Sequence, residues 1–185
     1  ESLSGCLKKL EDLKREIPGL FIPGQFVNPD NPEIHYQTTA REIWEQMEGC
    51  VDAFVAGVGS GGTLAGVGRF LKEKNPAIRV VAVEPANVSA LLGQEPGLHR
   101  IEGIGDGFIP DVLDVSIIDD VITVTDDDAI RTAQRLTLEE GALVGTSAGA
   151  NVWAAMEFAR RIGKDKKIVT VLPDRAERYF STALI

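Results

Sequence analysis

The sequence predicts an α/β fold built on an open, mostly parallel sheet with helices on both faces. Apolar runs that suit strands alternate along the chain with stretches of helical periodicity. These runs are continuous and do not alternate with polar residues, as expected of parallel strands that are covered on both faces. Glycine-rich turns follow two of the runs, and ligands of such sheets bind at the carboxyl ends of the strands.

The first quarter of the chain predicts a helix, a short strand, a loop and a second helix. Residues 1–15 carry apolar side chains on one helical stripe, and Cys6 lies on this stripe, where we expect it to be packed. Residues 20–22 form a short apolar run between two Pro-Gly pairs, which suits a strand. After a loop rich in Asn and Pro, Asn31-Pro32 suits the start of a helix that extends to about Met47.

The centre of the chain predicts one βαβ unit. Residues 53–56 form an apolar strand, residues 64–74 a helix and residues 80–83 a second strand. The turn between the first strand and the helix is rich in glycine. Such a turn presents backbone N–H groups at a helix N-terminus, where partial positive charge attracts a phosphate.

The last third continues the alternation of strands and helices. Residues 121–124 form a strand, after which Thr125 caps a helix with Asp128 at the capping-box spacing, and Gly141 ends it. The remaining elements are a short strand at 143–144, a helix from the glycine turn 145–149 to about 162, and a strand at 168–172.

Composition limits the classes of function. The hydrophobic content of 44% and charged content of 25% are those of an ordinary globular protein. The net charge of -9, without a basic cluster, argues against a nucleic-acid partner. The sequence shows no signal peptide and no apolar run of membrane-spanning length, so we expect no membrane partner and a cytoplasmic location. Its two cysteines form no Cys/His set, so no metal site is expected, and both histidines, His35 and His99, are expected at the surface.

The glycine turn allows several interpretations. Gly57, Gly59 and Gly62 fit the dinucleotide fingerprint G-x-G-x-x-G, and Glu84 lies near the spacing of a ribose-binding acid, which would suit a Rossmann-type nicotinamide oxidoreductase. A tight turn without a ligand and a non-catalytic module that binds a phosphate or a peptide C-terminus are two further alternatives. Ser60 and Thr63 add hydroxyl donors to the turn, and this favours a phosphate monoester.

Residues 57–63, Gly-Val-Gly-Ser-Gly-Gly-Thr, resemble the phosphate loop G-x-G-T-G-G-T of the pyridoxal-phosphate β-family. Five further segments resemble motifs of this family in the same order: residues 21–35, 38–44, 103–110, 145–150 and 172–182. The match extends over essentially the whole chain. The motifs are specific for the cysteine synthases, or O-acetylserine sulfhydrylases, and their relatives the cystathionine β-synthases. The resemblance implies the large domain of a fold type II pyridoxal-phosphate enzyme.

The resemblance also implies roles for individual residues. The cofactor phosphate would be bound by Gly57, Gly59, Ser60, Gly61, Gly62 and Thr63. Ser147 matches the serine that hydrogen-bonds the pyridine nitrogen. The substrate side would be formed by Gln25, Gly103, Gly105 and Gly107. No catalytic residue is assigned in this chain, because the family's Schiff-base lysine motif is absent and all eight lysines lie in other contexts.

The implied reaction is the β-replacement of O-acetylserine with sulfide to give cysteine and acetate, with pyridoxal 5'-phosphate as cofactor. The segment Thr146-Ser147-Ala148 also suits a cystathionine β-synthase-like enzyme. We expect residues 1–27 to be the end of the family's small domain and residues 28–185 the large domain, with the N-terminal third of the family fold absent and these 185 residues inactive alone. The resemblance implies a homodimer, with serine acetyltransferase as a candidate partner.

Overall fold

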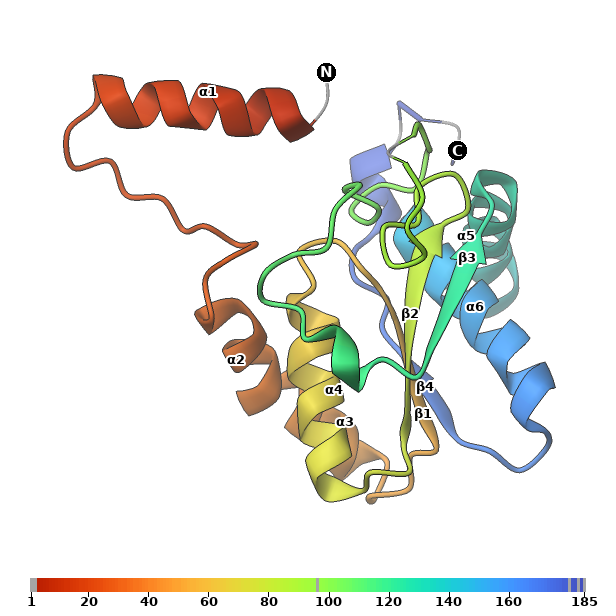
Figure 1. Cartoon of the computed structure of the whole chain (residues 1–185). Helices are drawn as coiled ribbons and strands as arrows, with labels where there is room; N and C mark the ends of the chain where they lie inside the picture. Colours follow the sequence, from red (N-terminus) through yellow and green to blue (C-terminus); the bar gives the residue numbers. More distant parts are fainter. Residues whose placement is uncertain (1–2, 96, 180, 183, 185) are drawn as a thin grey trace.

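The computed structural model describes residues 3–95, 97–179, 181, 182 and 184. Its centre is a parallel four-stranded sheet in the order β3-β2-β1-β4. The strands are Ala53–Gly57 (β1), Arg79–Pro85 (β2), Asp120–Val124 (β3) and Ile168–Thr170 (β4). Helices α2 (Asp30–Gln37), α3 (Thr39–Gln46) and α4 (Gly62–Lys74) cover one face of the sheet. Helices α5 (Asp126–Glu140) and α6 (Thr146–Ile162) cover the other (Figure 1). The predicted α/β fold is confirmed.

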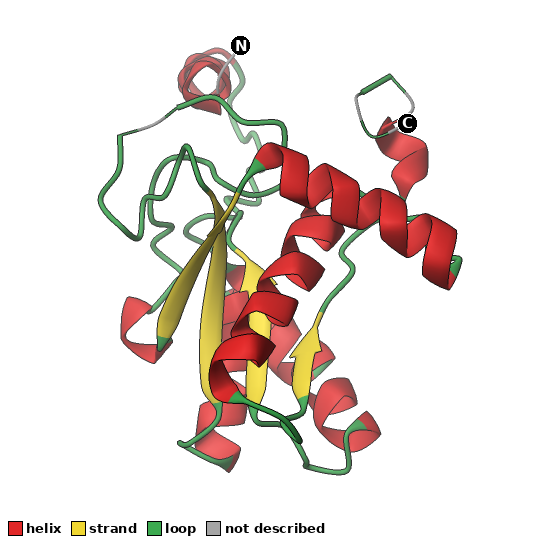
Figure 2. Ribbon diagram, turned by 90° about the vertical axis from the view of Figure 1, so that its right-hand side faces the viewer, coloured by secondary structure: helices red, strands yellow, loops and turns green. Residues whose placement is uncertain are grey.

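Each strand contributes side chains to the cores on both faces of the sheet, because successive side chains of a strand point to opposite faces. Phe54 and Ala56 of β1 pack with α4, whereas Ala53 and Val55 pack with α6. Figure 2 shows α6 lying along the sheet on this second face. Both faces are therefore apolar, which explains why the strands read as continuous hydrophobic runs.

The N-terminal segment departs in part from the sequence prediction. The predicted first helix is present as α1 (Leu3–Glu16), but it stands apart from the sheet in Figure 1. Cys6 is exposed and Leu7 is 40% exposed, so the expectation that Cys6 packs was wrong. Residues 20–22 form no strand, and Phe21 is 84% exposed. An apolar run becomes a strand only where another strand pairs with it, and this run pairs with none of the described strands.

The predicted helix from Asn31 to Met47 is divided in two. Helices α2 and α3 meet at Thr38, whose backbone (φ -119°, ψ -80°) leaves the helical region. Asn31 was the predicted cap and Pro32 the predicted first helical residue, but α2 begins two residues earlier, at Asp30, and Pro29 occupies its N-cap. Asn31 is therefore not a cap, and its side chain bonds instead to residues outside the helix.

The remaining elements follow the prediction with small changes. Thr125 caps α5 by accepting a hydrogen bond from the Asp128 N–H at 3.2 Å, and Gly141 ends α5 in the left-handed region. The predicted strand at 143–144 is one antiparallel bridge between Val144 and Arg175. Two short 3-10 helices, Val115–Ile117 and Ala176–Tyr179, were not predicted. No helix in the described part of the chain is long and apolar enough to cross a membrane.

Candidate functional site

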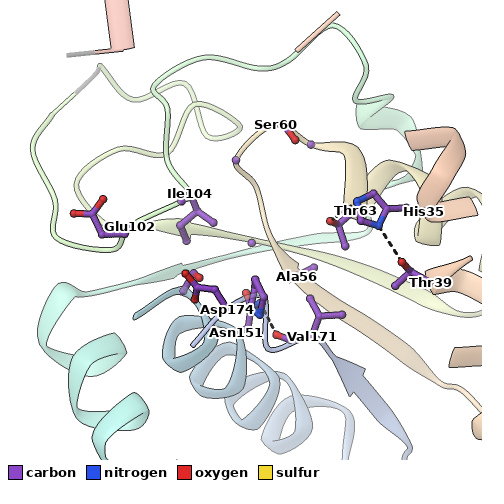
Figure 3. A pocket seen from close by; sticks show the side chains of 16 residues that line it. His35, Thr39, Ala56, Ser60, Thr63, Glu102, Ile104, Asn151, Val171 and Asp174 are labelled. Atoms are coloured by element: carbon purple, nitrogen blue, oxygen red, sulfur yellow. Dashed lines mark hydrogen bonds between the residues drawn. The ribbon is translucent and has the colours of Figure 1, made fainter. Parts of the chain in front are cut away.

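A cavity of ≈ 360 Å³ opens beyond the carboxyl ends of β1 and β4. The chain reverses its strand order between these two strands, because β2 and β3 lie on one side of β1 and β4 on the other. Open α/β sheets bind ligands at such a switch point. The cavity wall includes the glycine turn after β1, the loop at Gly103, the first turn of α6 and the segment after β4 (Figure 3).

The glycine turn forms one wall of the cavity. Five of the six residues predicted to bind phosphate line it: Gly57, Gly59, Ser60, Gly61 and Thr63. Gly61 is the N-cap of α4 and has φ 81°, which a residue with a side chain adopts only with strain. The turn thus places backbone N–H groups and two hydroxyls at the start of a helix. This arrangement is typical of anion-binding sites.

Gly62 does not line the cavity, although it belongs to the same turn. It is buried against α2, and a Cβ there would lie 2.0 Å from Oδ1 of Asn31. The glycine at position 62 is therefore explained by the close approach of two helices. The position of the glycine turn therefore depends on its contact with α2.

The loop at Gly103 forms a second wall, which adjoins the glycine turn. A Cβ on Gly59 would lie 2.2 Å from the Gly103 oxygen, and the Gly105 N–H donates to the Val58 oxygen at 2.9 Å. Of the three glycines predicted on the substrate side, Gly103 lines the cavity, whereas Gly105 and Gly107 lie farther along the loop. The structure therefore brings together Gly59 and Gly103, which lie far apart in the sequence.

Ser147 lies in the first turn of α6 and is 4% exposed. It lines the cavity, and the N-cap of α6 is Gly145, without a side-chain cap hydrogen bond. The Ser147 hydroxyl is therefore not used to cap its helix. Gln25 is exposed and does not line this cavity; its backbone oxygen accepts a hydrogen bond from Asn31 at 2.8 Å.

Two residues that the sequence did not single out carry unsatisfied polar atoms in the cavity wall. Asn151 is 1% exposed and donates from Nδ2 to the Val171 oxygen at 2.9 Å, but its Oδ1 has no partner among the described residues. The same holds for Oδ1 of Asp174, whose Oδ2 accepts a hydrogen bond from the Tyr179 hydroxyl. Burial and this bond raise the pKa of Tyr179. Buried polar atoms are normally paired, so a hydrogen-bond donor belongs here.

The position of Asn151 offered one signal that sequence reasoning could have used. It follows Ser147 by four residues on α6 and therefore lies on the same face of the helix. In Figure 3, Asn151 and Asp174 lie at one side of the cavity, while Ser60 and Thr63 lie at the other. The cavity thus has a donor-rich end at the glycine turn and an acceptor-bearing end at α6.

His35 also lines the cavity, so the expectation of a surface position was wrong for this residue. Its Nε2 lies 3.2 Å from Oγ1 of Thr63, and its Nδ1 lies 3.1 Å from Oγ1 of Thr39. Burial lowers the pKa of His35, which keeps the ring neutral at neutral pH. His99 is half-buried, with Nε2 3.0 Å from the Gly105 oxygen.

Glu84 is not placed to hold a ribose. It is 2% exposed, and its carboxylate accepts hydrogen bonds from the Ser89 hydroxyl at 2.5 Å and the Leu91 N–H at 3.2 Å. It does not line the cavity, and burial raises the pKa of its carboxyl group. The Glu84 carboxylate is thus already hydrogen-bonded inside the fold and is not available to bind a ribose, as a dinucleotide site would require. This argues against the nicotinamide alternative.

The cavity wall holds no lysine among the residues that the structure describes. Within the same residues, no group of three or more His, Cys, Asp or Glu side chains could hold a metal ion. The chemistry available in the wall is therefore that of amides, hydroxyls, one imidazole and two carboxylates.

The comparison with known families decides between the remaining alternatives. The family model described as pyridoxal-phosphate dependent enzyme matches residues 1–174. The chain belongs to this family. It is 49% identical over all 185 residues to the cysteine synthase of Staphylococcus aureus (strain Mu50), and it spans 59% of that relative's length.

Solved structures of family members agree. An O-acetyl serine sulfhydrylase, isoform 3 from Entamoeba histolytica, matches with TM-score 0.90 and 40% identity over 98% of this chain and 54% of that one. An O-acetylserine dependent cystathionine β-synthase from Helicobacter pylori matches with TM-score 0.91 and 44% identity over 98% of this chain and 59% of that one. The fold is therefore that of the family's cofactor-binding enzymes.

Members of this family use pyridoxal phosphate, and the cavity fits that group. A phosphate suits the glycine turn, where side chains at Gly57 and Gly59 would meet neighbouring atoms at 2.6 and 2.2 Å. A ring that carries a nitrogen and a hydroxyl suits the α6 end, where Ser147 and the unpaired oxygens of Asn151 and Asp174 lie. The cavity therefore has groups that can hydrogen-bond to both ends of the cofactor.

Proposed function

We propose that this chain forms the cofactor-binding part of a pyridoxal-phosphate cysteine synthase. The enzyme would replace the acetate of O-acetylserine with sulfide, giving cysteine and acetate. The observation that carries the proposal is the cavity at the switch point, with an amide and hydroxyl cup at one end and Ser147 at the other. The 49% identity to a cysteine synthase supports the choice of reaction.

At the phosphate end, backbone N–H groups of the glycine turn and the hydroxyls of Ser60 and Thr63 would donate to the phosphate oxygens. Six residues share this proposed role: Gly57, Gly59, Ser60, Gly61, Gly62 and Thr63. The positive end of the α4 dipole adds to the attraction for a dianion. Gly62 would contribute through its backbone, since it faces α2.

At the ring end, the Ser147 hydroxyl would hold the pyridine nitrogen. A neutral hydroxyl stabilises a protonated ring less than a carboxylate does, so the ring stays a moderate electron sink. When bound, the cofactor withdraws electrons from the amino acid so that acetate can leave from its β-carbon. Gln25 and the Gly103, Gly105 and Gly107 loop would bind the amino-acid substrate.

We further propose that residues 28–185 form the large, cofactor-binding domain and residues 1–27 the end of the family's small domain. Because no lysine lines the cavity among the described residues, the 185-residue chain alone should bind the cofactor without a covalent bond and should not turn over substrate. A homodimer, a serine acetyltransferase partner and a cytoplasmic location are proposed by resemblance to the family.

A cystathionine β-synthase-like reaction is the second candidate. The Helicobacter pylori enzyme that the chain resembles at 44% identity is described as an O-acetylserine dependent cystathionine β-synthase. The two reactions share the cavity and differ in the sulfur nucleophile, which is sulfide in one and homocysteine in the other. Competition between the two nucleophiles for the loaded full-length enzyme would separate them.

The test of the cofactor proposal is a titration of the purified chain with pyridoxal phosphate, pyridoxal and inorganic phosphate. We expect pyridoxal phosphate to bind at least tenfold more tightly than pyridoxal, since phosphate contacts each contribute about 1 kcal/mol. Borohydride reduction at equimolar cofactor should leave the intact mass unchanged. Equal affinity for the two aldehydes, or a stoichiometric covalent adduct, would refute the proposed cup or the proposed lack of an anchor, respectively.

A further inference from the structure

Helix α2 packs directly against the glycine turn and contacts it through two polar side chains. Asn31 and His35 are four residues apart and therefore lie on the same face of α2. Asn31 contacts the Ser60 hydroxyl, and His35 contacts the Thr63 hydroxyl. Each hydroxyl of the proposed phosphate cup is thus paired with one residue of α2, and of these two residues His35 also lines the cavity.

Two glycines of α4 allow this contact. A Cβ on Gly62 would lie 2.0 Å from Asn31 Oδ1, and a Cβ on Gly66 would lie 2.2 Å from the Pro32 oxygen and 2.8 Å from the Cβ of His35. Gly62 and Gly66 are also four residues apart, so they form a smooth stripe along one side of α4. Without it, α2 could not come close enough to place its two side chains.

The hydrogen bonds of Asn31 fix the direction of the Ser60 hydroxyl. Nδ2 of Asn31 lies 2.8 Å from the Gln25 backbone oxygen, which can only accept, so this atom is the amide nitrogen. The same nitrogen donates to Ser60 Oγ at 3.0 Å. Since Ser60 accepts from Asn31, its own proton is free to point into the cavity.

His35 can do the same for Thr63. A neutral imidazole has one donor and one acceptor nitrogen. With the proton on Nε2, the ring donates to Thr63 Oγ1 at 3.2 Å and Nδ1 accepts from the Thr39 hydroxyl at 3.1 Å. The Thr63 proton is then also free to point into the cavity. The opposite tautomer would draw that proton away from a bound anion.

We propose that Asn31 and His35 are positioning residues that orient the Ser60 and Thr63 hydroxyls as donors toward a bound phosphate monoester. A dianionic phosphate presents only acceptors, so it pairs best with a cup whose hydroxyls all donate. The burial that lowers the His35 pKa keeps the ring neutral and able to accept from Thr39. This inference rests on the proposed phosphate cup and adds the two residues that orient its hydroxyls as donors.

The test compares the affinities of the 185-residue chain for pyridoxal phosphate and pyridoxal across variants of His35. His35→Phe should weaken pyridoxal phosphate binding about tenfold and leave pyridoxal binding unchanged, because only the phosphate contacts depend on Thr63. His35→Gln, whose amide can donate and accept, should retain most of the affinity. In a Thr63→Val background the effect of His35→Phe should disappear, since the two residues act through one hydroxyl.

The outcomes separate this inference from the proposed function. A wild-type chain that binds both aldehydes equally would overturn the phosphate cup and this inference with it. A wild-type chain that prefers pyridoxal phosphate, with a His35→Phe variant that keeps the preference or loses affinity for both aldehydes equally, would overturn this inference alone. Thr39→Val, which removes the bond to Nδ1 of His35, provides a milder variant whose affinity for pyridoxal phosphate should fall about threefold. An unchanged affinity would show that the Thr39 hydroxyl does not orient the His35 ring.

Discussion

The backbone oxygen of Gly103 occupies the space that a side chain on Gly59 would need, since a Cβ on Gly59 would lie 2.2 Å from it. The turn proposed to bind the phosphate and the loop proposed to face the substrate therefore touch backbone to backbone. Both glycines line the cavity, and the contact between them exists only while position 59 has no side chain. The geometry of the two loops is consequently coupled.

Gly59→Ala should separate the two loops. Because the contact is with backbone and not with a flexible side chain, one of the loops must move, and we expect a loss of about 1–3 kcal/mol in the free energy of unfolding. The affinity for pyridoxal phosphate should fall by more than tenfold. Urea denaturation and a cofactor titration measure the two effects.

Gly5→Ala is the matched control for this substitution. Gly5 lies in α1, and nothing lies within 4 Å of the position that its Cβ would take. The change should therefore leave cofactor affinity unaltered and should not destabilise the chain, since alanine favours helix over glycine. Equal behaviour of the two variants would mean that the contact between Gly59 and Gly103 has no effect on the site.

Substitution at the α6 end should have a different signature from substitution at the phosphate end. Asn151→Ala removes the unpaired Oδ1 that we expect a donor on the ligand, or a bound water, to satisfy. The affinities for pyridoxal and pyridoxal phosphate should therefore fall by the same factor, about fivefold, so that their ratio is preserved. Ser147→Ala should behave alike, whereas Thr63→Val should reduce the ratio. A preserved affinity for both aldehydes in Asn151→Ala would exclude the residue from the ligand site.

The elements that the sequence predicted well are those set by local signals. The strand at 53–57 and the helix at 62–74 follow from an apolar run and the glycines between them, and the start of α5 follows from Thr125 and Asp128. Those that failed depend on distant partners. The run at 20–22 has the composition of a strand but no neighbouring strand to pair with among the described residues.

The candidate site shows the same division. The glycine turn and Ser147 belong to recognisable motifs that each lie at the start of one helix. His35 enters the cavity wall only because α2 crosses α4 at Gly66, a contact between helices that no local pattern displays. The spacing of Asn151 from Ser147 places it on the same face of α6, but no local pattern displays that its Nδ2 donates to the distant Val171 or that its Oδ1 has no partner among the described residues.

The cap of α5 offers a test of stability far from the cavity. Thr125 accepts a hydrogen bond from the Asp128 N–H, and three aspartates occupy the first turn of the helix. Thr125→Ala should lower the free energy of unfolding by about 1 kcal/mol, because the N–H groups of the first turn lose a partner. Thr125→Ser keeps the hydroxyl and should retain most of the stability. Equal midpoints of urea unfolding for alanine and serine would show that the hydroxyl does not stabilise the helix.

The depressed pKa of His35 predicts a dependence of stability on pH. Burial lowers the pKa of His35 in the folded chain below its ordinary value of 6.5. As the pH falls through about 6.5, the unfolded chain therefore takes up a proton that the folded chain does not, and stability decreases until the pH reaches the folded pKa. Above about 6.5 both states are neutral at this residue, so it contributes no pH dependence there.

A comparison of wild type with His35→Gln isolates this effect. Glu84 and Asp106, whose pKa values are raised by burial, also titrate above their ordinary values, but they are present in both chains. Their contribution cancels when the two slopes are subtracted. Between pH 7.5 and 5.5, the wild type should lose more unfolding free energy than the variant, by about 1.4 kcal/mol for each unit of pKa depression that falls within this window. Parallel slopes would show that His35 titrates equally in the folded and unfolded chains, and hence that the cavity wall does not shield it from water.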